Sequence, residues 1–286
     1  MMFNWVEIAQ QNSRERYEEL SAFLNENQFP NKVDFIEATE ANLSEVIVEA
    51  QKKYHGVRVG RGLGELILPL LTDHDGMVEK VRAADALVRQ DGKWWLRANA
   101  VDGFRRVLVR EGERLDLGSS VLVVGAGAAA RVAITGLFMT GFKNFVVSNL
   151  EEKRAHEMAQ GLRKTHLGIH LEIVPKDGLI LLPGVHGLLV NTTPMTKDNA
   201  MLEELYYFNF FKMGGVAVDF SISPVDTPLL LGAKDIGATC LFGYQISAQT
   251  DLIWCEQISG RSFSSVAYEE RLAVRLREKD KNSNPG

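Results

Sequence analysis

The chain has 286 residues, which is enough for two domains of ordinary size, and its 45% apolar and 24% charged residues are typical of soluble globular proteins. A net charge of −5 argues against nucleic acid or an anionic membrane as a partner. No stretch is apolar for long enough to cross a membrane, and the N-terminus lacks the pattern of a signal peptide, so we expect a cytoplasmic protein.

The first part of the chain alternates helical and strand-like segments. A helix is predicted over residues 13–25, where apolar residues recur at helical spacing, and a strand over 33–36. A second helix over 42–53 leads to a short strand over 56–59 and to an apolar run over 66–71 that we expect to be buried. This alternation predicts a parallel α/β layer.

A second unit follows a linking helix predicted over 103–113. Its strands are expected over 121–124, 144–148, 171–174, 187–190 and 215–219, with a helix over 128–140. A helix over about 249–260 is expected to return to the first domain, and the polar residues 278–286 are expected to be frayed.

Cysteine and histidine usage indicates neither a disulfide framework nor a metal site. The two cysteines, Cys240 and Cys255, fit a reducing compartment, and neither has a metal-ligating neighbour. His166 and His170 are spaced as ligands on one helix face would be, but Gly168 lies between them and a strand follows. We therefore interpret both histidines as loop residues and predict no metal.

A Gly-x-Gly turn after the strand over 121–124 opens the helix over 128–140. Gly125 and Gly127 allow a tight turn and a close approach of the backbone, and the helix N-terminus offers free N–H groups to phosphates. The pattern is typical of dinucleotide-binding domains, although glycine turns of this kind also occur without a ligand.

Several motifs in the same order resemble those of the shikimate dehydrogenase family. Its phosphate loop reads Gly125-Ala126-Gly127-Ala128-Ala129-Ala130-Arg131 here, and its Asn-Ala-Thr-Pro reads Asn191-Thr192-Thr193-Pro194. Its Asp-x-x-Tyr-x-Pro-x-x-Thr-Pro-Leu is similar to Asp219-Phe220-Ser221-Ile222-Ser223-Pro224-Val225-Asp226-Thr227-Pro228-Leu229. The resemblance covers most of the chain.

The resemblance implies a two-domain α/β fold. An α/β substrate domain over 1–104, completed by C-terminal helices over 244–286, would accompany a Rossmann-type doubly wound dinucleotide-binding domain over 105–243. The residues that would bind the cofactor are Gly125, Gly127, Ala128, Ala129, Arg131, Asn149, Glu151, Arg154, Asn191, Thr192, Thr193, Pro194 and Gly243.

The choice between NAD and NADP depends on residues 149–154. Family members that use NADP carry Asn-Arg-Thr-x-x-Arg there, whereas this chain has Leu150 in place of the first arginine. Glu151 would repel a 2′-phosphate and could accept a hydrogen bond from a ribose 2′-hydroxyl, which favours NAD. Lys153 and Arg154 could still reach a phosphate, and the segment could also be the charged first turn of an exposed helix.

The family's catalytic positions are changed in this chain. In the ungapped register the catalytic lysine falls on Gly64 and the catalytic aspartate on Ala100. Neither residue can exchange a proton or bind a substrate hydroxyl, and acid–base help is worth about 10²–10⁴-fold in rate. We therefore expect that shikimate is not the substrate. A second register, which needs a deletion, would place Asp102 nearer the aspartate site.

Charged residues around these positions offer replacement chemistry. Arg58 and Arg61 could hold a carboxylate or phosphate, and Asp85 or Asp102 could carry the proton. These charged residues could instead lie on the solvent-exposed edge of a cleft and have no function. Gln249 matches the family's substrate-contacting glutamine, or it bonds the helix backbone.

Tyr244 stands where the family has a glycine beside the nicotinamide ring. It could fill the ring's pocket, serve as a replacement acid, or pack against its neighbours.

Together the glycine turn, the family motifs and the changed catalytic positions predict an NAD(P)-dependent oxidoreductase for a small, acidic hydroxy or keto compound other than shikimate. The alternatives are a catalytically inactive nucleotide- or metabolite-binding pseudoenzyme, serving as a sensor or partner subunit, and a structural relic. A homodimer is left open.

Overall fold

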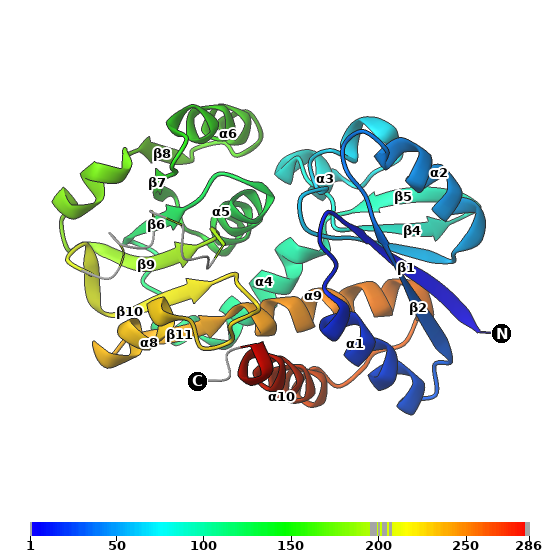
Figure 1. Ribbon diagram of the computed structural model, residues 1–286. Coiled ribbons are helices and arrows are strands. Elements are labelled where there is room, and N and C mark those ends of the chain that lie inside the picture. The colour runs from blue at the N-terminus through cyan, green and yellow to red at the C-terminus, as the bar shows by residue number, and fades with distance from the viewer. Residues whose placement is uncertain (1, 195–198, 200, 202–204, 206–207, 284–286) are drawn as a thin grey trace. The chain divides into compact units, whose positions relative to one another are not determined.

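The computed structural model describes residues 2–194, 199, 201, 205 and 208–283, and it divides into two compact units (Figure 1). Unit 1 comprises Met1–Gly103 and Ala248–Gly286, and unit 2 comprises Phe104–Ser247. The sequence analysis expects these divisions at 104/105 and 243/244 instead. Both units consist of a β-sheet with helices, so the predicted α/β class is confirmed.

Unit 1 contains a five-stranded sheet in the order β2-β1-β3-β4-β5. The strands are β1 (Phe3–Ala9), β2 (Asn31–Glu37), β3 (Gly56–Val59), β4 (Ala86–Gln90) and β5 (Lys93–Arg97). The first three pair in parallel, but β4 and β5 are antiparallel, so the expectation of a parallel layer is only partly correct. Asp91 and Gly92, both with positive φ, form the tight turn of the β4–β5 hairpin.

The helices of unit 1 follow the predicted pattern where apolar spacing is strong. Helices α1 (Arg14–Glu26) and α2 (Leu43–Lys53) agree with prediction to within a residue. Helix α3 spans Gly76–Val81, and α10 spans Ser265–Ser283. The apolar run over 66–71 is instead a short 3₁₀ turn, Leu68–Leu70, in which Leu70 is 37% exposed. Ile67 is fully buried, and Leu66, Leu68 and Leu71 pack against the core of unit 1, whereas Pro69 and Leu70 are exposed, so the prediction of a buried run is only partly correct.

Unit 2 contains a six-stranded parallel sheet in the order β11-β10-β9-β6-β7-β8 (Figure 1). Its strands are β6 (Ser120–Val124), β7 (Asn144–Ser148), β8 (His170–Ile173), β9 (His186–Asn191), β10 (Phe211–Asp219) and β11 (Thr239–Phe242). Its helices are α5 (Ala128–Thr140), α6 (Glu152–Thr165) and α8 (Pro228–Asp235), with 3₁₀ turns at Gly112–Arg114 and Lys176–Leu181.

The chain leaves β6 toward β7 on one side of the sheet and later returns to β9 on the other side. The strand order therefore reverses between β6 and β9, whose last residues Val124 and Asn191 are register partners. In doubly wound sheets, ligands bind at the carboxyl ends of the strands at such a reversal. The glycine turn begins directly after Val124, at this point.

Two helices begin earlier than predicted, and a side chain accepts a backbone hydrogen bond at the start of each. Helix α4 (Asn99–Arg110) was expected to start at 103, but the Asp85 carboxylate accepts a hydrogen bond from the Ala100 N–H at 2.6 Å. Helix α9 (Gly243–Ser259) was expected to start at about 249, but Gln245 Oε1 accepts from the Phe242 N–H at 2.9 Å. Caps of this kind satisfy N–H groups that have no partner within the helix.

Replacement of Gly103 tests the packing of α4 within unit 1. A Cβ at this position would lie 2.3 Å from Thr250 Oγ1 and 2.8 Å from the Thr250 backbone nitrogen. We expect Gly103→Ala to destabilise the protein by about 1–3 kcal/mol, because backbone cannot give way as a side chain can. Gly112→Ala is the matched control, since nothing lies within 4 Å of its Cβ. Equal urea midpoints for the two variants would contradict the described packing.

Candidate functional site

Unit 2 presents the glycine turn predicted to bind phosphate. The Gly125 N–H donates to Ser148 O at 2.8 Å, and its φ of +115° favours glycine. A Cβ on Gly125 would lie 2.2 Å from Thr192 Oγ1, whereas no described residue lies within 4 Å of a Cβ on Gly127. Gly127 caps α5, whose first N–H groups lack partners within the helix. The turn can therefore accept an anion in front of Gly127.

The segment after β9 forms one wall of this turn. The N–H and the hydroxyl of Thr192 both donate to Val124 O, at 2.9 and 2.7 Å. Asn191 Oδ1 in turn accepts from the N–H and the hydroxyl of Thr193, at 3.0 and 2.7 Å. The structure thus brings Gly125, Asn191, Thr192 and Thr193 together, as the sequence predicted, and Pro194 follows at an exposed position.

The residues expected to select the cofactor lie at the start of α6. Glu151 is the N-terminal capping residue of α6, and its side chain makes no cap hydrogen bond. Glu151 and Arg154 are both exposed, and the Asn149 amide donates to Glu151 O at 2.9 Å. Arg131, at the start of α5, is half-buried. A negatively charged and a positively charged side chain are therefore both available at the start of α6, so the geometry is compatible with NAD and with NADP.

Gly243 is buried, and its lack of a side chain serves packing within unit 2. A Cβ there would lie 2.2 Å from Ser221 O and 2.7 Å from Phe220 O. The next residue, Tyr244, is half-buried, and its ring centroid lies 5.6 Å from that of Phe242. This stacking corresponds to the packing role considered for Tyr244.

Unit 1 brings together Gly64 and Ala100, the positions at which the resemblance predicts the family's catalytic residues. Gly64 O accepts from the Ala84 N–H at 2.9 Å, and the adjacent Asp85 accepts from the Ala100 N–H. Gly64, Asp85 and Ala100 therefore lie in one place, although they are far apart in the sequence. Asp85 is the acidic side chain at this place, and Asp102 lies half-buried in the first turn of α4.

The Asp85 side chain is 19% exposed and therefore reachable from solvent. Burial raises its pKa, while Arg58 and the N–H groups of Ala100 and Asn99 act in the opposite direction. A carboxyl with a raised pKa is suited to taking and returning a proton nearer neutral pH.

Arg58 lies in the core rather than at a substrate surface. Its side chain is 2% exposed, and its guanidinium lies 3.4 Å from Asp85 and 3.3 Å from Asp251. Asp251 also receives a bidentate pair of hydrogen bonds from Arg16, at 2.9 and 2.7 Å. The prediction that Arg58 holds a substrate carboxylate is therefore wrong, because its charge is already shared between two acids.

Glu7 is a member of this buried cluster that sequence reasoning missed. It is fully buried in β1; its Oε2 accepts from the Ser13 N–H at 2.8 Å, and its Oε1 has no partner among the described residues. Burial raises the pKa of Glu7, with Arg16 and Arg58 opposing the shift. A glutamate within the otherwise apolar segment Val6–Ile8 is the signal that could have identified it.

The two remaining substrate candidates differ in accessibility. Arg61 is exposed and donates to Gln11 Oε1 at 3.0 Å. Gln249 is buried, and its Nε2 donates to Glu269 Oε1 at 2.5 Å. Gln249 therefore bonds a side chain of α10, not the helix backbone, and its amide nitrogen is already engaged.

The described residues contain no group of three or more His, Cys, Asp or Glu side chains that could hold a metal. His166 follows α6 and is buried, with Nδ1 2.8 Å from Thr165 Oγ1, while His170 begins β8. The reading of both as loop residues is thus wrong for His170. No helix in the described ranges has the length and apolarity to span a membrane.

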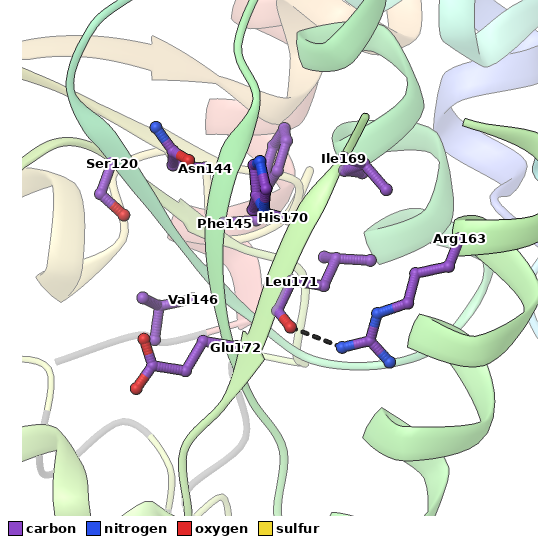
Figure 2. Close-up of a pocket in the computed structure, with 9 residues that line it drawn as sticks. All are labelled: Ser120, Asn144, Phe145, Val146, Arg163, Ile169, His170, Leu171 and Glu172. Carbon is purple, nitrogen blue, oxygen red and sulfur yellow. Dashed lines mark hydrogen bonds between the residues drawn. The ribbon is translucent and has the colours of Figure 1, made fainter. Parts of the chain in front are cut away.

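A hollow of about 360 Å³ lies in unit 2 at the edge opposite the glycine turn (Figure 2). It includes Ser120, Asn144 and His170, which begin strands β6, β7 and β8. The Arg163 guanidinium at its rim donates to Leu171 O at 2.6 Å. The hollow therefore lies at the amino ends of the strands and takes no part in the candidate site.

Comparison with known proteins gives a consistent result. No family model matches the chain. It is 26% identical to the shikimate dehydrogenase (NADP(+)) of Trichormus variabilis over 237 residues, which is 80% of each chain. It is 30% identical to the enzyme of the same name from Geobacter sulfurreducens over 176 residues, which is 60% of each chain.

Solved structures share the fold over almost the whole chain. Shikimate 5-dehydrogenase from Thermus thermophilus, in complex with NADP(H) and shikimate, has a TM-score of 0.80 at 21% identity, covering 96% of this chain and 100% of that one. Quinate dehydrogenase from Corynebacterium glutamicum, in complex with NAD, has 0.82 at 18%, covering 96% and 99%. The 5-ketofructose reductase of Gluconobacter has 0.79 at 17%, with the same coverage.

Removal of the Asp251 charge tests the buried cluster. Asp251→Asn would remove the buried carboxylate that pairs with both Arg16 and Arg58, so we expect a loss of about 3–5 kcal/mol in unfolding free energy. Glu49→Gln is the control, because its pair with Lys52 is exposed and worth less than about 1 kcal/mol. Urea unfolding of both variants measures the difference, and similar losses would contradict the assignment.

Proposed function

We propose that the chain, which resembles the shikimate dehydrogenase family in sequence and in fold, is an NAD(P)-dependent oxidoreductase. Its substrate is a small, acidic hydroxy or keto compound other than shikimate. Unit 2 binds the dinucleotide, and unit 1 supplies the acid–base group. The observation that carries the proposal is the glycine turn, in which no described residue lies within 4 Å of a Cβ on Gly127.

The residues of unit 2 fit a dinucleotide at this turn. The backbone of Gly125 and Gly127 and the N-terminus of α5 would hold the pyrophosphate. Glu151, exposed at the start of α6, would accept from a ribose hydroxyl and favours NAD, whereas Arg154 keeps NADP open. When bound, the nicotinamide supplies or accepts a hydride.

Asp85 is the proton carrier of the proposed reaction. Oxidation of an alcohol requires a base for the hydroxyl proton, and Asp85 lies beside Gly64 and Ala100, which cannot provide one. Because Gly64 and Ala100 also offer no side-chain hydrogen bond, the hydroxyl contacts of the family's substrate are missing. Of the two candidate arginines, Arg58 and Arg61, the exposed Arg61 would bind the acidic group of the substrate.

A binding-only role is the second candidate, and two observations favour it. The Gln249 amide nitrogen is engaged by Glu269, and Asp85 already accepts from the Ala100 N–H and from Arg58. A protein that binds a nucleotide or metabolite as a sensor or partner subunit needs neither side chain for chemistry. Turnover separates the two roles.

Titration calorimetry with NAD, NADH, NADP and NADPH is the first test. We expect NAD(H) to bind more tightly than NADP(H), and Gly127→Asp to abolish binding, because a carboxylate would face the pyrophosphate. Gly112→Asp is the control, since it adds the same charge to unit 2 at another open position. Absence of binding by all four dinucleotides would overturn the dehydrogenase proposal.

Asp85→Asn tests the proton carrier once a screen of hydroxy and keto acids has found turnover. We expect turnover to fall by about 10²–10⁴-fold while the dinucleotide Kd stays unchanged. In the wild type, alcohol oxidation should decrease as the pH falls through the pKa of Asp85, which burial holds above its usual value. The variant should lack this limb. If the pH profile of Asp85→Asn equals that of the wild type, Asp85 caps α4 and does not carry the proton. If the wild type shows no turnover at all, the binding-only role is favoured.

A further inference from the structure

Asp219 is a buried acid at the carboxyl edge of the unit 2 sheet that the proposed reaction does not use. It is the last residue of β10 and is 0% exposed. Its register partner is Asn191 of β9, which is also the partner of Val124 in β6. Asp219, Asn191 and Val124 therefore form one row across the sheet, and the glycine turn begins at the end of that row.

Both oxygens of the Asp219 carboxylate are occupied by donors within unit 2. Its Oδ1 accepts from the Ser221 N–H at 2.8 Å. Its Oδ2 accepts from Thr227 Oγ1 at 3.0 Å and from Asn191 Nδ2 at 3.3 Å. A buried carboxylate saturated in this way cannot touch a ligand directly, so any effect on binding must pass through its partners.

The carboxylate determines how the Asn191 amide is oriented. An ionised carboxylate only accepts hydrogen bonds, so Asn191 must turn its NH₂ group toward Asp219. The amide oxygen then points away from Asp219 and accepts from the N–H and hydroxyl of Thr193. The opposite orientation would place the Asn191 amide oxygen against an Asp219 oxygen, so that two acceptors meet, and it would lose the hydrogen bond from the Thr193 N–H.

The orientation of Asn191 bears on the glycine turn through the next two residues. Thr192 donates twice to Val124 O, and its Oγ1 occupies the space where a Cβ of Gly125 would be. The segment Thr192–Thr193 thus lies directly against the turn, and the Asn191 side chain holds that segment from the other end.

We propose that Asp219 is a positioning residue for dinucleotide binding, which acts through Asn191 to hold Thr192 and Thr193 against the glycine turn. The proposal rests on the proposed function, because it takes the turn as the dinucleotide site. Asp219 contacts neither the cofactor nor the substrate.

A double-mutant cycle with Asp219→Asn and Asn191→Ala tests the proposal, read by calorimetry with the dinucleotide that the wild type binds most tightly. We expect either change alone to weaken binding by about tenfold or more, since a hydrogen bond to a charged group is lost. The two changes together should weaken it no further than Asn191→Ala alone, because Asp219 acts through Asn191. Additive losses, or an unchanged Kd in either single variant, would overturn the proposal.

Two further variants separate positioning from plain stability. Thr227→Val removes another hydrogen bond of Asp219 and the cap of α8, but leaves the Asn191 contact. It should lower Tm while changing the dinucleotide Kd by less than about threefold. Asp177→Asn makes the same chemical change at an exposed position of unit 2 and should alter neither quantity. A Kd that follows Tm across all variants would overturn the proposal.

Amide hydrogen exchange keeps this test apart from the test of the proposed function. If the wild type binds none of the four dinucleotides, the dehydrogenase proposal fails, and exchange at the Thr193 N–H then decides on positioning. We expect Asp219→Asn to speed this exchange by about tenfold or more relative to the Val123 N–H in β6. Equal acceleration at both sites, or none, would overturn it. If Asp219→Asn does not fold, Asn191→Ala is decisive by the same readouts.

Discussion

The buried guanidinium of Arg58 is the interaction on which the architecture of unit 1 depends. It lies on β3 and pairs with Asp85, which follows the loop before β4, and with Asp251 of α9. Asp251 in turn binds Arg16 of α1 and accepts from the Tyr268 hydroxyl of α10 at 3.1 Å. This charged cluster thus connects the sheet of unit 1 to helices α1, α9 and α10. Its cost is the desolvation of every member, which only mutual pairing offsets.

The balance of charge in this cluster has a consequence for chemistry. Glu7, Asp85 and Asp251 face two guanidinium groups, those of Arg16 and Arg58. Burial raises the pKa of Glu7 and of Asp85, and the guanidinium groups of Arg16 and Arg58 oppose this shift. Of these two acids, Asp85 reaches solvent and Glu7 does not. The cluster that stabilises the fold therefore also prepares the proposed proton carrier.

Sequence reasoning succeeded where the information is local. The helices α1, α2 and α5 and the glycine turn depend on spacing within a few residues, and all were predicted. It failed where partners are distant: Arg58 is neutralised by residues 27 and 193 positions away, and no periodicity reveals this. The early start of α4 has the same origin in Asp85. The β4–β5 hairpin is a different case, because the Asp91–Gly92 turn was a readable signal that the prediction left unused.

The two units therefore give evidence of unequal weight about catalysis. The glycine turn is built into the packing of unit 2, since Thr192 fills the space above Gly125 and Asn191 and Asp219 hold Thr192 and Thr193 from beneath. Selection for stability alone would retain these residues, whether or not a ligand binds. Gly64 and Ala100, where the resemblance to the family places a lysine and an aspartate, have no side chain that could exchange a proton. The case for chemistry consequently depends on unit 1, and within it on whether Asp85 exchanges protons or only caps α4.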